Sequence, residues 1–402
     1  MNKLLIGIIG KSNVGKSTFF NAATSLGVQT ANFPFTTVEP NIGIGYVKTG
    51  CVCREFQVQD NPLHSMCIGG SRYIPIKILD IAGLVPGAHN GRGLGNQFLD
   101  SAREADALVH VIDAAGSTDS EGRAVSPGTG DPLHDAEFVL EEFDMWLVTH
   151  LKKKLMSSRD SQGSSDSMQK VLSRQLSGMS VRESQVAASL NGTGLGNKKL
   201  SSWSEADLLL FCRTLRRFAK PMIIAANKAD IMTAEPNLEK LKSLDSMVVP
   251  CVSEAEVMLR LGSRNGMLRY SPGDNSFEIL PNTLLREDQK KALDKVRAVL
   301  TKYGSTGVQT VLNGLCFVLL GMIVVYPVED ENRLTDKKGN VLPDAYLLPK
   351  ESTAKDLAKK VHEQLGKGFL YAIDVRTKQR VGAEHKLKDR DIIKIVSATS
   401  RR

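Results

Sequence analysis

The sequence has few aromatic residues and few cysteines, and each shortage excludes a class of protein. Phe, Trp and Tyr together make up 5% of the 402 residues, too few to indicate a platform on which single-stranded bases stack. The six cysteines are unevenly spaced, which argues against a disulfide framework and predicts a reducing compartment. Hydrophobic residues still make up 42% of the chain, which is enough for folded cores.

Long hydrophobic runs are also missing. The most apolar stretch, Val311–Val328, contains Asn313 and Gly314, and this fits a core helix followed by a strand better than a membrane span. The first residues, MNKLLIG, begin an apolar strand and lack the charged and apolar regions of a signal peptide. We therefore expect no membrane segment and a cytoplasmic location.

Residues Gly10–Ser17 read GKSNVGKS, a complete G-x-x-x-x-G-K-[ST] phosphate loop. An apolar run precedes it and a potential helix follows it, as the motif requires. Backbone N–H groups of the loop would surround phosphate oxygens, Lys16 would reach the β- and γ-phosphates, and the Ser17 hydroxyl would bind Mg²⁺. The pattern predicts a nucleoside triphosphate site formed by Gly10, Ser12, Asn13, Val14, Gly15, Lys16, Ser17 and Thr18.

Three further elements follow in the order expected of a guanine nucleotide site. Asp80-Ile-Ala-Gly83 ends an apolar run. It would bring a carboxylate near Mg²⁺, usually through a water molecule, and a glycine N–H to the γ-phosphate. Asn227-Lys-Ala-Asp230 matches N-K-x-D, in which the Lys228 stem packs over guanine and the Asp230 carboxylate accepts from N1–H and the N2 amino group. Adenine lacks these donors and would leave the carboxylate unpaired. A loop N–H would meet the guanine O6 near Ser253, Glu254 and Ala255.

The segments around these motifs carry a resemblance to a known family. Residues 32–41 (NFPFTTVEPN), 80–89 (DIAGLVPGAH) and 91–96 (GRGLGN) are similar to the switch segments of the Obg-like (Obg/YchF) translation-factor GTPases. The C-terminal part resembles the TGS domain, a small β-grasp module of that family. The chain most resembles the archaeal and eukaryotic YchF-related branch. In the better-known YchF branch the base-reading motif departs from N-K-x-D and ATP is preferred, whereas this chain keeps the motif, which favours GTP.

The resemblance implies roles for further residues. Thr37 would be the switch threonine, with Thr36 as the alternative. Leu84 stands where Ras-like enzymes carry a water-orienting glutamine, so hydrolysis is either intrinsically slow or helped by another group or a partner. Asn13 resembles the asparagine of K⁺-stimulated GTPases; alternatively, it only holds the shape of the loop. The implied catalytic residues are Lys16, Thr37, Gly83 and Asn13, the Mg²⁺ ligands are Ser17, Thr37 and Asp80, and nearby polar candidates are His89 and Arg92.

Charge is unevenly distributed along the chain. The net charge is −6 over residues 1–149, +8 over 150–220, −1 over 221–349 and +7 over 350–402. Basic appendages on an acidic or neutral core indicate a polyanionic partner. In the family that the chain resembles, this implies RNA or the ribosome, contacted through the phosphate backbone. A solvated basic surface without such a partner is the alternative.

The pattern of elements predicts an α/β fold. We expect a P-loop, Rossmann-like sheet over residues 1–134 and 220–321, a helical insertion over 135–219 and a TGS β-grasp domain over 322–402. In the insertion, helices over 135–155 and 204–218 predict a hairpin, and the serine-rich interval 157–180 is expected to be mobile. Ser204 is expected to cap the second helix of the hairpin, and Thr353 with Asp356 to form a capping box.

Three cysteines lie near a histidine in the sequence, and Cys51, Cys53, His64 and Cys67 form a conceivable zinc set. The C-x-C spacing closes tetrahedral geometry less well than C-x-x-C, so ordinary loop and strand thiols are the favoured interpretation.

Together these observations predict a Mg²⁺-dependent switch that binds and hydrolyses GTP and acts with the ribosome or RNA. Bound nucleotide would order residues 31–41 and 83–96, and hydrolysis would release them. Two alternatives are an ATPase of the same fold and a ribosome or RNA adaptor with structural nucleotide and negligible turnover.

Overall fold

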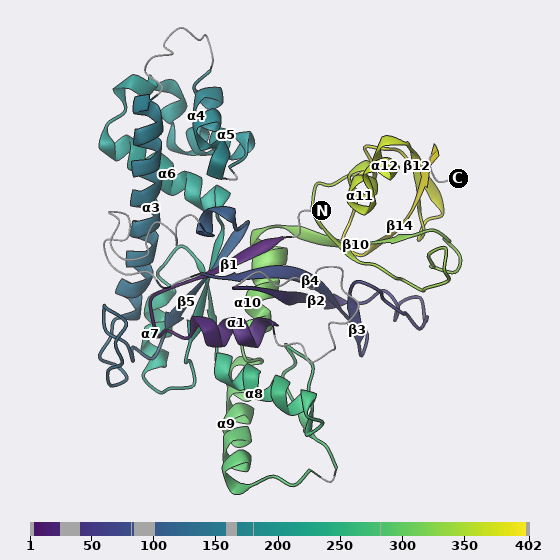
Figure 1. The fold of residues 1–402 in the computed structure, drawn as a ribbon, viewed down its shortest axis with the longest axis horizontal. Helices are drawn as coiled ribbons and strands as arrows, with labels where there is room; N and C mark the ends of the chain where they lie inside the picture. The colour runs from purple at the N-terminus through teal and green to yellow at the C-terminus, as the bar shows by residue number, and fades with distance from the viewer. Residues whose placement is uncertain are drawn as a thin grey trace.

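A computed structural model describes residues 4–24, 41–81, 83, 101–157, 167–179, 181–281 and 283–398. Its main sheet has the strand order β2-β4-β1-β5-β6-β7, with β3 paired to β4 (Figure 1). The parallel strands are β1 (Leu5–Ile9), β4 (Ser71–Asp80), β5 (Ala107–Asp113), β6 (Met222–Asn227) and β7 (Met247–Pro250). Two strands run antiparallel to β4, namely β2 (Ile42–Gly50) and β3 (Met66–Ile68).

Helices cover both faces of this sheet because alternate strand residues point to opposite sides. On one face, α1 (Lys16–Thr24) and α10 (Val308–Asn313) pack against Ile6 and Ile8 of β1. On the other, α7 (Ala234–Leu241) and α9 (Glu287–Tyr303) pack against Ile112 and Ile224. The remaining elements of this part are α8 (Ser253–Arg264), β8 (Leu268–Arg269), β9 (Glu278–Ile279) and a π-helical turn, Gly314–Leu319.

The insertion rises from the sheet at the left of Figure 1, and its described residues form the α-helices α3 (Pro132–Ser157), α4 (Met168–Leu176), α5 (Glu183–Thr193) and α6 (Glu205–Ala219). Both predicted helices are present as α3 and α6 and share one hydrophobic core. The prediction missed α4 and α5, and α4 lies within the interval that was expected to be mobile. Leu172 and Val186, one from each unpredicted helix, are fully buried in the core of the insertion. The predicted cap is confirmed, since Ser204 Oγ accepts from the Asp207 N–H in a capping box.

The C-terminal sheet has the order β11-β10-β14-β12-β13, with the central strands β10 and β14 parallel. A helix, α11 (Ala354–Val361), begins at the predicted Thr353–Asp356 capping box and packs against the sheet through Leu357, and α12 (Glu363–Lys367) follows it. The strands are β10 (Met322–Val328), β11 (Tyr346–Pro349), β12 (Phe369–Asp374), β13 (Gln379–Val381) and β14 (Asp391–Ser397).

The fold class is therefore as predicted: an α/β P-loop sheet, a helical insertion and a β-grasp domain. The exact domain limits stay a prediction. Among the residues that the structure describes, no helix is both long and apolar enough to cross a membrane.

Candidate nucleotide site

The predicted nucleotide motifs lie at one edge of the main sheet. Gly10 directly follows β1, Asp80 ends β4 and Asn227 ends β6. The strand register pairs Ile8 with Asp80 and Asp113 with Asn227, so the carboxyl ends of these strands are level. Ligands of open parallel sheets bind at this edge.

The backbone of the phosphate loop requires two of its glycines. Gly10 has φ +143° and Gly15 has φ +98°, conformations that other residues rarely adopt. A Cβ atom at Gly10 would lie 2.3 Å from the Val111 carbonyl oxygen, and one at Gly15 would lie 2.2 Å from Asn227 Nδ2. The loop thus lies against the ends of β5 and β6, and it leads into α1, whose first turn contains Lys16, Ser17 and Thr18.

Lys16, Ser17 and Asp80 lie close together at the start of α1. Lys16 Nζ donates to the Lys11 carbonyl oxygen over 2.7 Å. Burial lowers the pKa of Lys16, and the Asp80 charge partly offsets this. Ser17 Oγ donates to Asp80 Oδ2 over 3.3 Å. Burial raises the pKa of Asp80, while the Ser17 hydrogen bond and the Lys16 charge lower it.

The glycine of the D-x-x-G motif also lies against the phosphate loop. A Cβ atom at Gly83 would lie 2.8 Å from Ser12 Oγ and 3.1 Å from Lys16 Nζ. A side chain at this position would therefore push against the loop lysine.

Asn227 joins the phosphate loop to the start of α8. Its Nδ2 donates to the Val14 carbonyl oxygen over 3.1 Å. Its Oδ1 accepts from the Ser253 N–H over 3.1 Å and from Ser253 Oγ over 2.9 Å. The Asn227 side chain is buried, so these hydrogen bonds are shielded from water and fix three motifs relative to one another.

Lys228 connects the base-reading motif to the same loop. Its Nζ donates to Asp113 Oδ2 over 2.8 Å, to Ser117 Oγ over 2.9 Å and to the Asn13 carbonyl oxygen over 3.4 Å. Asp230, two residues later, is exposed.

Ser253, Glu254 and Ala255 form the first turn of α8 and not the loop that the sequence predicted. The N–H groups of a first helical turn have no partners inside the helix. The Ser253 N–H is taken by Asn227 Oδ1, which leaves those of Glu254 and Ala255 as the candidates to meet an acceptor.

Asn13 contacts a neighbouring loop. It has φ +62°, and its Nδ2 donates to the Gly122 carbonyl oxygen over 2.9 Å. A Cβ atom at Gly122 would lie 2.8 Å from the Ser12 carbonyl oxygen. The loop containing Gly122 thus packs on the phosphate loop, and the predicted role of Asn13 toward K⁺ stays a prediction.

The sequence reasoning missed two acidic residues of the site. Asp135, in the first turn of α3, pairs with Lys11 of the phosphate loop over 2.5 Å, and both side chains are buried. This contact joins residues 124 positions apart, so no local pattern indicates it. Asp113 accepts from Ser117 and Lys228. Its position at the end of a run that is apolar except for His110 was a signal that the sequence did offer.

Several predicted residues lie outside the described part of the chain: Thr36, Thr37, Leu84, His89 and Arg92. Their roles stay predictions.

The conceivable zinc set is wrong in one ligand. His64 Nδ1 lies 2.6 Å from Asp344 Oδ1, in the loop that leads to β11. Asp60 instead joins the three cysteines of the set. The sequence could not indicate this, because the partner of His64 is 280 positions away.

Comparisons with known proteins assign these parts to families. Residues 5–137 match the family model of 50S ribosome-binding GTPases, and residues 225–330 match the model of the Obg-like GTPase YGR210-like, G4 motif-containing domain. Residues 334–397 match the TGS domain. The first strand of the β-grasp sheet, β10, precedes this last match.

Two similar proteins span nearly the whole chain, and a third spans part of it. A GTP-binding protein of Methanocaldococcus jannaschii is 47% identical over 396 residues, which cover 98% of this chain and 99% of that protein. The crystal structure of a GTP binding protein from Pyrococcus horikoshii OT3 has 37% identity and a TM-score of 0.76, covering 98% of this chain and 100% of that chain. The ribosome-binding ATPase YchF of Mycoplasma genitalium is 34% identical over 254 residues, 61% of this chain and 62% of that protein. The chain therefore belongs to the Obg-like, YchF-related family of P-loop GTP-binding proteins with a TGS domain.

Proposed function

We propose that this protein is a Mg²⁺-dependent switch that binds and hydrolyses GTP and acts with the ribosome or with RNA. The observation that carries the proposal is the Asn227 bridge from the N-K-x-D motif to the Val14 carbonyl oxygen and to Ser253. Because one side chain holds the phosphate loop and the base-reading motif together, phosphates and a base at these motifs would belong to one ligand.

Ser17 and Asp80 would hold Mg²⁺, with Thr37 as the third proposed ligand. Hydroxyl and carboxylate oxygens are the ligands that Mg²⁺ prefers. The 3.3 Å between Ser17 Oγ and Asp80 Oδ2 is close to the about 2.9 Å expected between adjacent ligands of an octahedral Mg²⁺ site. The bound ion would neutralise charge on the β- and γ-phosphates, while Lys16 contacts the same oxygens.

The choice between GTP and ATP depends on Asp230. Its carboxylate pairs with guanine donors and would be left unpaired by adenine, which supports GTP. The alternative is ATP, since a relative similar over 61% of this chain is called an ATPase.

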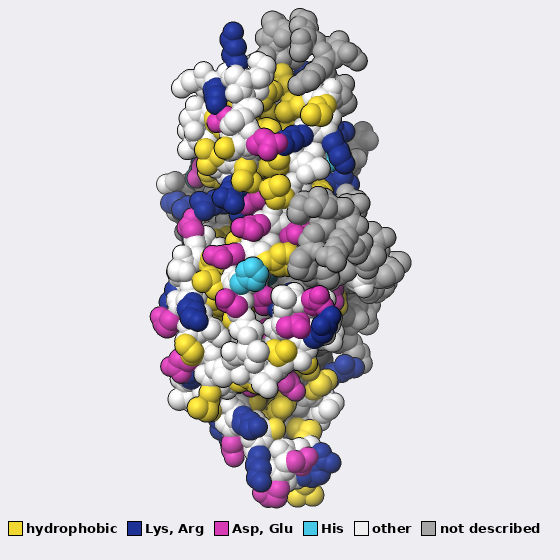
Figure 2. Space-filling view, turned by 90° about the vertical axis from the view of Figure 1, so that its left-hand side faces the viewer, with side chains coloured by type: hydrophobic (Ala, Val, Ile, Leu, Met, Phe, Trp, Pro, Cys, Tyr) yellow, Lys and Arg dark blue, Asp and Glu magenta, His cyan; other side chains and the backbone are white. Residues whose placement is uncertain are grey.

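The proposal of a polyanionic partner is supported by the basic surface of two appendages. A groove of about 990 Å³ lies between the insertion and the C-terminal domain. Figure 2 shows Lys and Arg side chains scattered over one face of the molecule among hydrophobic side chains, with Asp and Glu side chains most frequent near its middle. The net charges of +8 over residues 150–220 and +7 over residues 350–402 fit a partner that presents nucleic acid phosphates, and a relative is called ribosome-binding. The groove itself is mixed: Arg182, Arg217, Lys359 and Lys360 line it together with Asp106, Asp344, Asp356 and many apolar side chains. Lys220 also lines it but is buried, and its Nζ donates to the carbonyl oxygens of Arg103 and Ala105.

The test is hydrolysis of GTP and of ATP with Mg²⁺, in K⁺ or Na⁺ buffer, with and without ribosomes. We expect slow GTP turnover that ribosomes accelerate and that Lys16→Ala abolishes. Faster turnover of ATP than of GTP would favour the ATPase. No turnover of either nucleotide under any condition would overturn the proposal of a hydrolysing switch. It would favour the alternative of a ribosome or RNA adaptor in which the nucleotide is structural. Asn13→Ala, compared in K⁺ and Na⁺, tests the proposed potassium site.

A further inference from the structure

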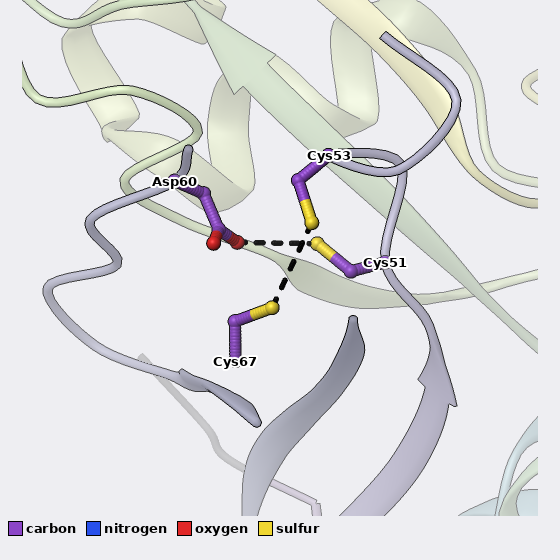
Figure 3. A group of neighbouring side chains, drawn as sticks. All are labelled: Cys51, Cys53, Asp60 and Cys67. Atoms are coloured by element: carbon purple, nitrogen blue, oxygen red, sulfur yellow. Dashed lines mark hydrogen bonds between the residues drawn. The ribbon is translucent and has the colours of Figure 1, made fainter. Parts of the chain in front are cut away.

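Four side chains with metal-binding atoms meet beside β3, near the end of β2 and the start of β4. Cys51 follows the last residue of β2, and Cys67 is the middle residue of β3. The turn after β2 brings in Cys53 and Asp60. Figure 3 shows the four side chains pointing toward a common centre, and their ligand atoms all lie within 4.8 Å of one another.

The distances fit one tetrahedral metal ion. Cys53 Sγ and Cys67 Sγ are 3.8 Å apart. With a Zn–S distance of about 2.3 Å, the edge of a tetrahedron of sulfurs is about 3.8 Å. Cys51 Sγ lies 3.2 Å from Asp60 Oδ2, and a Zn–O bond is shorter than a Zn–S bond.

We propose that this protein binds one structural Zn²⁺ through Cys51, Cys53, Cys67 and Asp60. Three thiolates and one carboxylate select zinc over hard cations such as Mg²⁺. Four protein ligands leave no open position for a substrate, so the site is structural. It is separate from the nucleotide site and does not depend on the proposed function.

A buried arginine completes the site. Arg72, on β4 beside Cys67, is fully buried, and its Nη2 donates to Asp60 Oδ2 over 2.8 Å. Its positive charge offsets part of the excess negative charge of the four ligands around Zn²⁺. Its hydrogen bond also fixes the orientation of the carboxylate, as outer-shell partners do in other metal sites.

Arg72 also contacts the C-terminal domain and so connects the proposed metal site to it. Arg72 Nη2 also donates to the Leu342 carbonyl oxygen over 3.0 Å, and its guanidinium lies 5.4 Å from the centre of the Tyr326 ring. The segment after Asp60 continues this contact, since the Asn61 N–H donates to the Val341 carbonyl oxygen over 3.0 Å. The zinc site thus fastens the end of the GTPase sheet to the C-terminal domain.

The experiment measures zinc by mass spectrometry in the full chain, purified without chelators from cells supplied with zinc. We expect one zinc per chain in the wild type and in Cys212→Ala, a control that removes a buried thiol of the insertion. Cys67→Ser and Asp60→Asn should lose the bound zinc; Cys67 is the least buried of the three thiols, so its replacement disturbs packing least.

A second readout does not depend on how well the variants fold. Wild-type protein stripped of metal and loaded with Co²⁺ should display the absorption of tetrahedral, thiolate-bound cobalt. Three outcomes would overturn the proposal: wild type without zinc and without this cobalt spectrum, zinc retained in both ligand variants, or a disulfide between Cys53 and Cys67 in freshly isolated protein.

Discussion

Replacing Asn227 by alanine should weaken both the fold and nucleotide binding, because one buried side chain joins the phosphate loop to α8. The substitution removes the donor to the Val14 carbonyl oxygen and the acceptor of two hydrogen bonds from Ser253. Val14 and Ser253 are each 1% exposed, so bulk water does not reach the groups that lose their partners.

The expected magnitude follows from these contacts. A buried polar group that loses its partner costs about 1–3 kcal/mol, and a water molecule in the space left by the amide would recover part of this cost. The Ser253 hydroxyl can rotate toward another acceptor, so the cost comes mainly from the Val14 carbonyl and the Ser253 N–H. For these two groups we expect the free energy of unfolding to fall by about 2–4 kcal/mol. Without the Asn227 side chain to hold it, the phosphate loop should bind nucleotide at least about tenfold more weakly, which corresponds to a loss of about 1.4 kcal/mol in binding free energy.

The assay combines urea unfolding with equilibrium binding of a fluorescent GDP analogue. Asn237→Ala is the matched control, since Asn237 is also buried and its Nδ2 donates to the carbonyl oxygens of Ala114 and Thr233 over 2.9 and 3.1 Å. This control should lose about 1–3 kcal/mol of stability and keep the wild-type affinity. Wild-type affinity in Asn227→Ala, measured where the variant is fully folded, would refute the reasoning.

Three further predictions follow from contacts elsewhere in the chain. Asp135→Ala should lower the free energy of unfolding by about 3–5 kcal/mol in urea, because it leaves Lys11 buried without its counter-charge; an unchanged midpoint would contradict this. Burial lowers the pKa of His110 from 6.5 to about 3. As the pH falls, the unfolded chain therefore takes up a proton on this histidine before the folded chain does, and the free energy of unfolding should fall by about 2 kcal/mol between pH 7 and pH 5. His110→Gln should remove that part of the pH dependence, and an identical slope in both proteins would argue against a neutral buried histidine. Ser204→Ala should cost about 1 kcal/mol by loss of the capping box, and equal thermal midpoints would show that the cap contributes nothing.

Features that depend on neighbouring residues could be predicted from the sequence. The Ser204 cap and the Thr353–Asp356 capping box are examples, because each uses residues three positions apart. The phosphate loop, Asp80 and Asn227 come together for a related reason, since parallel strands that end in polar residues share one edge.

The unpredicted helices show where local patterns fail. Serines lower the helix propensity around α4, and short helices gain most of their stability from packing. Leu172 and Leu176 in α4 are both buried in the core that α3 and α6 also form, a contact that the sequence alone does not reveal. The His64–Asp344 and Lys11–Asp135 pairs were missed for the same reason.

The central claim, a guanine-specific site, is tested most directly by equilibrium competition of GTP, GDP and ATP against a fluorescent guanine nucleotide with Mg²⁺. Wild type should prefer guanine nucleotides strongly, and Asp230→Ala should lose this preference while keeping its fold. Binding of ATP as tight as that of GTP in the wild type would contradict the claim and leave only a site for triphosphates.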